Sequence, residues 1–420
     1  MPSVGSYAQA VGRSGFRAIS EWLQELPGPE VALHIGAPDL PSPAHVVAAV
    51  EQAVRRGTAR YGPNRGEPEL VEAIRAKLVR QNDVRVGTEQ VFVTAGATQG
   101  VHLALSAILA PGQEVLVPDP GWPNYAMAVR SLGGVARPYA LAADGSAATQ
   151  LAELERAITP ATHVIVVNSP GNPTGAVLSA ETLHGLVDLA RRRDLWVVSD
   201  ECYESFQFTG PHLSPAALDD ERVISCFSFS KTFAMPGMRV GYLVVPRALS
   251  ALCLRLQEMA ICCVNIAAQA GALAALEGPQ QALTDMRTTY LRRRAGVTRT
   301  LRDAGIPYTD PQGAFYVFAR VTAPPFGHDD KGGDWDWTRE LLREKRVLVA
   351  PGSTFGARGG GWVRIALTAD DEALAEGIAR LVAFCHADAD ADASLTVPTG
   401  TADERRDPVG ARPRPGPAAQ

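Results

Sequence analysis

Several features that mark special classes of protein are missing from this sequence. No apolar run approaches the length of a membrane span, and no charged amino terminus followed by an apolar stretch suggests a secretory signal. No lysine-rich stripe is present, only 20% of the residues are charged, and the formal net charge is −5. We therefore expect no membrane role and no nucleic-acid binding.

Cysteine is scarce and is not spaced for a metal site. The six cysteines stand at positions 202, 226, 253, 262, 263 and 385, without the paired spacing of metal ligands. We expect no metal centre. Cys202, Cys226 and Cys253 lie in apolar patterns typical of buried thiols, and a reducing cytoplasm fits such thiols best.

The chain does contain enough apolar material for a large core. Hydrophobic residues make up 46% of 420 residues, so we expect two lobes rather than one small domain. From Gln90 to Val245, apolar strands alternate with helical patterns, which predicts an α/β domain with a mostly parallel sheet covered on both faces. Strand patterns near 315–320, 346–349 and 362–367 predict a smaller α+β domain.

A lysine follows one of the predicted strands in a Ser/Thr-rich turn. The apolar run 222–227 leads directly into the segment SFSKTF, which contains Lys231, and Arg239 follows eight residues after that lysine. An ordinary surface lysine in a loop is one interpretation of this pattern, because loops carry solvated charge as well as function. The other is a lysine that forms a Schiff base with an aldehyde cofactor.

Two further polar segments follow predicted strands. The segment NSPGNPTG comes after an apolar run, and its two prolines and two glycines fix a tight path that would hold the amide of Asn172 in place. Asp200 ends the apolar run WVVSD and begins the segment DECY, which also contains Tyr203. An acid at the carboxyl end of a parallel strand lies where open α/β sheets bind ligands.

Together these three segments resemble the fold type I pyridoxal-phosphate enzymes, and among them the class I/II aminotransferase family, over about residues 31–384. The resemblance implies that Lys231 forms a Schiff base with pyridoxal 5′-phosphate and moves a proton between the substrate Cα and the cofactor. Asp200 matches the aspartate that pairs with the pyridine nitrogen and keeps it protonated. Asn172 and Tyr203 match the groups that hydrogen-bond the phenolic oxygen of the cofactor.

The resemblance also implies a phosphate site. A small-residue turn joins a predicted strand to a predicted helix, at a place where backbone N–H groups can approach an anion. The residues that match the phosphate contacts of the family are Gly96, Ala97 and Thr98 in this turn, with Ser228 and Arg239.

Two aromatic residues match cofactor contacts of the family. Trp122, in the segment PGWP, matches the aromatic residue that stacks on the pyridine ring, although a tryptophan after a strand is often part of the core. Tyr61 matches the tyrosine that reaches the phosphate from the neighbouring subunit, so we expect a homodimer. A loop aromatic packed in an interface is the alternative for Tyr61.

Substrate binding requires a cation for the α-carboxylate. Arg364 stands among apolar neighbours in WVRIAL, so it should be paired with a structural acid or a ligand carboxylate. The carboxylate-binding arginine of the family falls on Arg364, and Gly36 and Asn172 match residues that also meet the substrate.

Thr98 stands where similar bacterial aspartate aminotransferases carry a lysine for the side-chain carboxylate. With the apolar run 259–264, which could equally pack in an interface, this favours a neutral or hydrophobic substrate side chain over aspartate.

These patterns divide the chain into four parts. We expect an N-terminal segment packed on the small domain over 1–41, a large cofactor-binding domain over 42–285, and a small C-terminal domain over 286–386. Residues 387–420, with an Ala-Asp repeat and a Pro/Gly/Arg-rich end, have the composition of a disordered tail.

The expected activity is transamination between an L-amino acid and a 2-oxo acid, in amino-acid metabolism. A lyase, a cyclase and an oxygen-using amino-acid oxidase or deaminase of this fold would share every cofactor contact named above, so these reactions remain alternatives. A transcription regulator with this fold as its sensor lobe would need a DNA-binding domain, for which the segment before Val31 is too short.

Overall fold

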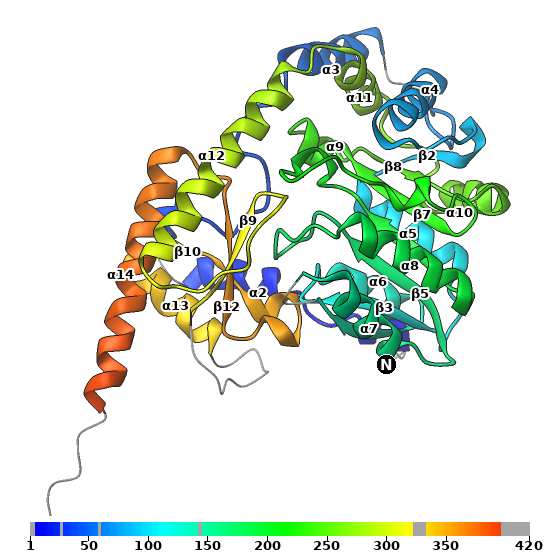
Figure 1. Ribbon diagram of the computed structural model, residues 1–420. Coiled ribbons are helices and arrows are strands. Elements are labelled where there is room, and N and C mark those ends of the chain that lie inside the picture. Colours follow the sequence, from blue (N-terminus) through cyan, green and yellow to red (C-terminus); the bar gives the residue numbers. More distant parts are fainter. Residues whose placement is uncertain (1–4, 26–27, 58–59, 142–144, 322–332, 396–420) are drawn as a thin grey trace, which may run out of the picture.

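The computed structural model describes residues 5–25, 28–57, 60–141, 145–321 and 333–395 (Figure 1). It has a larger lobe built on a seven-stranded sheet and a smaller lobe built on a three-stranded sheet, and one long helix runs between them. This arrangement confirms the predicted α/β class with a mostly parallel sheet.

The sheet of the larger lobe follows the order β2-β8-β7-β6-β5-β3-β4. Its neighbouring strands pair in parallel, except that β8 runs antiparallel to both β2 and β7. Most of its residues are buried, because the strands carry runs of β-branched and apolar side chains that suit a sheet covered on both faces. The strands are β2 (Val91–Thr94), β3 (Glu114–Asp119), β4 (Val135–Ala140), β5 (Thr162–Asn168), β6 (Trp196–Asp200), β7 (Val223–Ser228) and β8 (Gly241–Val244).

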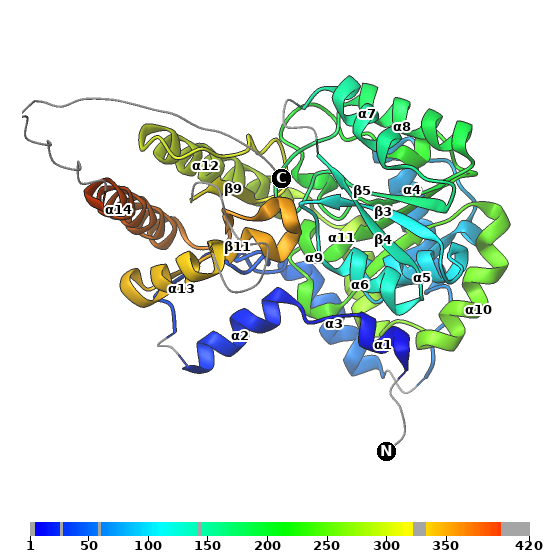
Figure 2. The same cartoon turned by 90° about the horizontal axis from the view of Figure 1, so that it is seen from below.

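Helices cover both faces of this sheet, and each face has its own apolar core (Figure 2). On one face lie α5 (Ala97–Ile108), α6 (Asn124–Ser131) and α10 (Ser250–Ile261). On the other lie α3 (Ala44–Arg56), α4 (Pro68–Lys77), α7 (Ala147–Ala157), α8 (Ala180–Arg193) and α11 (Ile266–Glu277). The short helix α9 (Phe229–Thr232) directly follows β7.

The smaller lobe has its own core cluster, to which Tyr203, Phe206 and Ala234 of the larger lobe also contribute. Its sheet pairs β11 (Ala350–Pro351), β12 (Trp362–Ala366) and β9 (Tyr316–Arg320) antiparallel in that order. A short parallel pair, β1 (Val31–Ala32) with β10 (Val347–Leu348), lies beside it. The helices of this lobe are α12 (Gln281–Asp303), α13 (Asp334–Lys345) and α14 (Asp371–Leu395). The boundary expected at 285/286 falls near the start of the continuous helix α12, which runs between the two lobes (Figure 1).

The N-terminal segment contacts both lobes. Helix α2 (Gly15–Glu25) packs on the smaller lobe, where Ile19 joins a core cluster with Phe318 and Phe355. The short helix α1 (Ser6–Ala10) instead lies beside α6 of the larger lobe.

Helix α14 continues to Leu395, so the first part of the tail 387–420, which was expected to be disordered, is helical. Alanine favours the helical conformation, and the Ala-Asp repeat is compatible with extending α14. Residues 396–420 lie outside the described part of the chain. Within the described residues, none of the helices combines the length and the apolar composition needed to cross a bilayer.

Candidate active site

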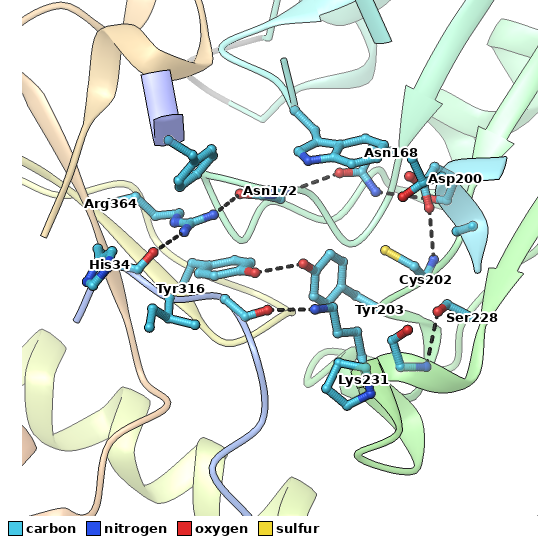
Figure 3. Close-up of a pocket in the computed structure, with 18 of the residues that line it drawn as sticks. His34, Asn168, Asn172, Asp200, Cys202, Tyr203, Ser228, Lys231, Tyr316 and Arg364 are labelled. Atoms are coloured by element: carbon cyan, nitrogen blue, oxygen red, sulfur yellow. Dashed lines mark hydrogen bonds between the residues drawn. The ribbon is translucent and has the colours of Figure 1, made fainter. Parts of the chain in front are cut away.

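A cavity of about 590 Å³ lies where the carboxyl ends of β5, β6 and β7 face the smaller lobe (Figure 3). Most of the residues singled out from the sequence line it, although they come from distant parts of the chain. They are Gly36, Ala97, Thr98, Trp122, Asn172, Asp200, Tyr203, Ser228, Lys231, Arg239 and Arg364.

Two of the predicted residues do not line the cavity. Gly96 lies just behind it at the N-terminus of α5, where a Cβ atom would come within 2.6 Å of the Nη2 atom of Arg239. Tyr61 is 86% exposed. The apolar run 259–264 does not line the cavity either, and Met259 within it is 75% exposed.

Lys231 is held at the end of β7 by the short helix α9. The hydroxyl of Ser228 accepts a hydrogen bond from the Ser230 N–H and so caps this helix. The Nζ atom of Lys231 donates to the carbonyl oxygen of Gly36 at 2.6 Å. Burial lowers the pKa of Lys231, and the positive charges of Arg364 and Arg239 lower it further. The amine therefore loses its proton more readily than a solvated lysine does.

Asp200 is buried at the end of β6 with a donor on each carboxylate oxygen. Tyr125 donates its hydroxyl to Oδ2 at 2.7 Å, and the Cys202 N–H donates to Oδ1 at 3.2 Å. Burial raises the pKa of Asp200, whereas the hydrogen bonds from Tyr125 and Cys202 act in the opposite direction. The acid is thus fixed in orientation inside the cavity wall.

Arg364 is a buried cation without a carboxylate partner among the described residues. Its Nη1 atom donates to the side-chain oxygen of Asn172 at 2.9 Å and its Nη2 atom to the His34 carbonyl at 2.7 Å, while Nε has no partner. The aromatic rings of Phe16, Tyr316 and Phe355 surround the guanidinium with centroids 5.2, 4.4 and 4.8 Å away. A buried guanidinium with an unused N–H is suited to binding an anion.

The position of Asn172 is fixed by Asn168, the last residue of β5. Its backbone N–H donates to the side-chain oxygen of Asn168 at 2.9 Å, and the Asn168 amide donates to the Asp200 carbonyl at 2.9 Å. A chain of hydrogen bonds therefore runs from the carboxyl end of β6 through both asparagines to Arg364 (Figure 3). It links the backbone that carries Asp200 at one end of the cavity to the guanidinium of Arg364 at the other.

Tyr203 and Tyr316 join the two lobes across the cavity. Tyr203 follows β6 and Tyr316 begins β9, and their hydroxyl oxygens lie 2.7 Å apart (Figure 3). Burial raises the pKa of both phenols, so both stay protonated near neutral pH. The sequence reasoning identified Tyr203 but not Tyr316.

The end of the cavity near α5 can bind an anion. The first residues of α5 present backbone N–H groups there, and Arg239 lies beside them in a left-handed conformation with φ of 54°. The guanidinium donates to the carbonyls of Pro236 and Ala95 at 3.0 and 3.4 Å. Gly96, with φ of 78°, allows this approach because it has no side chain.

Several lining residues had no assigned role in the sequence analysis, and four of them are large aromatic or imidazole side chains. Phe16 comes from α2, His34 precedes Gly36, Tyr125 lies three residues after Trp122, and Tyr316 begins a strand of the smaller lobe. For Tyr125 the short spacing from Trp122 was a usable signal. The others reach the cavity through the packing of the smaller lobe, which local patterns do not reveal.

Comparison with known proteins agrees with this geometry. Residues 29–381 match the family described as aminotransferase class I and II. The chain is 37% identical to an aspartate aminotransferase of Pyrococcus abyssi, over 84% of this chain and 90% of that protein. It is 35% identical to aromatic-amino-acid aminotransferase 2 of Thermococcus litoralis, over 89% of this chain and 96% of that protein.

Solved structures give the same result. Aspartate aminotransferase of Thermus thermophilus, in a structure with maleate, superposes with a TM-score of 0.84 at 33% identity, over 91% of this chain and 100% of that one. The aromatic aminotransferase of Pyrococcus horikoshii superposes with a TM-score of 0.79 at 35% identity, over 88% of this chain and 99% of that one.

Proposed function

This chain belongs to the class I and II aminotransferases, which are pyridoxal-phosphate-dependent transferases, and we propose that its substrate is an L-amino acid with a neutral or hydrophobic side chain. The amino group would pass through pyridoxal 5′-phosphate to a 2-oxo acid. The observation that carries the substrate proposal is the set of cations in the cavity.

The residues of the cavity fit this cofactor. Lys231 offers an amine of lowered pKa, and Asp200 offers a buried acid for the ring nitrogen. Trp122 lines the cavity where it could cover the ring, while Asn172 and Tyr203 would donate to the phenolic oxygen. The residues that would bind the phosphate are Gly96, Ala97, Thr98, Ser228 and Arg239.

When bound, the cofactor supplies a carbon that accepts the amino group and a ring that takes up the electrons of the Cα–H bond. Nζ of Lys231 would take the proton from Cα, because its lowered pKa makes the neutral base available. Asp200 would hold the proton on the ring nitrogen. Arg364, with Asn172 and the backbone of Gly36, would bind the α-carboxylate and orient the Cα–H bond towards Lys231.

The cations of the cavity support the substrate class. Among the described lining residues, the lysine and arginine side chains are Lys231, Arg239 and Arg364, and each has a role in this scheme. Burial, together with the charge of Arg364, lowers the pKa of His34 to about 4, so His34 is neutral near pH 7. Thr98 is uncharged. A second substrate carboxylate would therefore lack a partner from this chain, which disfavours aspartate.

The test is the absorbance spectrum of the purified holoenzyme mixed with single amino acids and no acceptor. Phenylalanine or leucine should convert the yellow cofactor to its amine form and release one 2-oxo acid per site, whereas aspartate should react more slowly. In Lys231→Ala the reaction should fall by at least about a thousandfold. Continued turnover without an acceptor would contradict transamination and would favour a lyase, cyclase or oxidase.

We also propose a homodimer in which Tyr61 reaches the phosphate of the neighbouring site. The support is its exposure of 86% in a single chain and its position outside the cavity. Subunits carrying Tyr61→Ala and subunits carrying Lys231→Ala, each of low activity alone, should regain activity when mixed, because one site of each hybrid dimer has both residues. No recovery in a verified hybrid would contradict a shared site.

Two finer features are also proposals. The division into a segment 1–41, a large domain 42–285 and a small domain 286–386 is supported by the separate cores of the two lobes. Calorimetry of the cofactor-free protein should resolve separate unfolding of the two lobes, and a single two-state transition would contradict the division. A cytoplasmic location is supported by six free cysteines, and cell fractionation tests it.

A further inference from the structure

We propose that Tyr125 is a positioning residue that holds the Asp200 carboxylate in line with the ring nitrogen of the cofactor, an inference that rests on the proposed function. Tyr125 is 1% exposed near the start of α6, and its hydroxyl donates to Oδ2 of Asp200 at 2.7 Å. The other donors to this carboxylate, the N–H and the thiol of Cys202, come from the same chain segment as Asp200.

The two oxygens of Asp200 have different partners. The Cys202 N–H donates to Oδ1 at 3.2 Å from the same chain segment, so this contact follows from the local backbone path. The Tyr125 hydroxyl reaches Oδ2 from a helix 75 residues away in sequence. The phenol therefore fixes the rotation of the carboxylate, and the remaining lone pairs stay available to a ligand in the cavity.

A second buried tyrosine gives a comparison for the role of this hydroxyl. Tyr139 is also buried in the larger lobe, and its hydroxyl donates to the Val166 carbonyl at 3.0 Å. That hydrogen bond gives a partner to a backbone carbonyl, and neither Tyr139 nor Val166 lines the cavity. The Tyr125 hydroxyl instead binds a side chain that lines the cavity, which is more than burial of a phenol requires.

Tyr125 also contacts the aromatic residue of the cavity wall. Its ring meets Trp122 edge-to-face, with centroids 5.2 Å apart and an interplanar angle of 82°. One side chain thus touches both the residue proposed to cover the cofactor ring and the acid proposed to bind its nitrogen. Removing only the hydroxyl separates the two contacts, because phenylalanine keeps the ring.

The experiment compares Tyr125→Phe with Tyr139→Phe in the holoenzyme. Because the lost hydrogen bond is made to a charged group, Tyr125→Phe should lower kcat about tenfold and weaken cofactor binding about tenfold. The KM for phenylalanine should change less than about twofold, because Arg364 binds the substrate at the other end of the cavity. Tyr139→Phe should leave all three values unchanged. Equal behaviour of the two variants would overturn the inference.

A double-mutant cycle separates positioning from general destabilisation. Cofactor dissociation is measured for Tyr125→Phe in the native background and in an Asp200→Ala background. If the hydroxyl acts through Asp200, its loss should cost less than about twofold once the carboxylate is gone. The same cost in both backgrounds would mean a merely structural role. A wild-type protein that binds no cofactor would overturn the proposed function, whereas normal transamination with an unaffected Tyr125→Phe would overturn this inference alone.

Discussion

The two ends of the cavity are built in different ways. At the end near the large sheet, Asn172 and Lys231 each follow a buried parallel strand and Asp200 ends one, and the three strands are neighbours. At the other end, Arg364 contacts rings from α2 and β9 and a backbone carbonyl from the segment after β1, which are far apart in sequence. The first end inherits its geometry from one rigid sheet, and the second depends on how several elements pack.

This difference matches the chemistry proposed for each end. A cofactor is the same molecule in every turnover, so a fixed array on strand ends serves it well. A substrate must enter and leave, and elements outside the main sheet can move for that purpose. Changes near the sheet should therefore affect cofactor binding, and changes near Arg364 should affect the amino acid.

Exchanging the two arginines for lysine gives the largest expected effect and the sharpest test of this contrast. Arg364→Lys keeps the charge but loses the paired N–H donors, so kcat/KM for phenylalanine should fall about a hundredfold, or about 3 kcal/mol. Its cofactor dissociation constant should stay unchanged. Arg239→Lys should show the reverse, with weaker cofactor binding and little change in KM. Similar defects in both variants would mean that the two ends are not independent.

Adding charge at Thr98, which lines the cavity at the start of α5, should alter the selectivity for the amino acid. Thr98→Lys places a cation in the cavity, and attraction to a second carboxylate should raise the preference for aspartate over phenylalanine about tenfold. Thr98→Met, of similar length but uncharged, serves as the control. The ratio of kcat/KM for the two amino acids measures the effect, and equal ratios in the two variants would refute it.

A smaller effect is expected where the lobes meet. Tyr316→Phe removes the 2.7 Å contact with the Tyr203 hydroxyl, which is worth about 1 kcal/mol, so kcat/KM should fall about fivefold. Thermal unfolding of the holoenzyme should hardly change, since the ring and its packing remain. A loss as large as that of Arg364→Lys would show that the tyrosine pair does more than join the lobes.

The smallest expected effect concerns the stability of the cofactor-free protein. Burial lowers the folded-state pKa of Lys231, so between that value and the unfolded value of about 10.4 the unfolded chain binds a proton that the folded chain does not. Stability should therefore rise with pH within this window, by at most about 1.4 kcal/mol per pH unit. Lys231→Met should flatten this rise, as measured by urea unfolding at several pH values. If the free energy of unfolding rises with pH equally steeply in Lys231→Met and in the unmodified protein, burial does not lower the pKa of Lys231.

The end near the sheet was largely predictable from sequence. Apolar runs mark the strands, and the polar residue that follows each strand must lie at the same edge, which identified Asn172, Asp200 and Lys231. The roles of these residues remain proposals.

The other end was less accessible to sequence reasoning. Arg364 stood out as a charge among apolar neighbours, but its aromatic surroundings Phe16 and Tyr316 depend on tertiary packing. Tyr125 was overlooked although its spacing from Trp122 indicated a place near the cavity, because no local pattern reveals its hydrogen bond to Asp200. The composition of the Ala-Asp repeat after Cys385 led to the prediction of a disordered tail, whereas α14 continues through the repeat to Leu395.

The continuous helix α12 has a consequence for building chimaeras from related proteins. Because one helix runs between the lobes, its length fixes how the smaller lobe is rotated about the helix axis relative to the larger one. One inserted residue would turn everything beyond it by about 100° and advance it by about 1.5 Å. A splice within 281–303 must therefore keep the residue count, or Arg364 would no longer face Lys231.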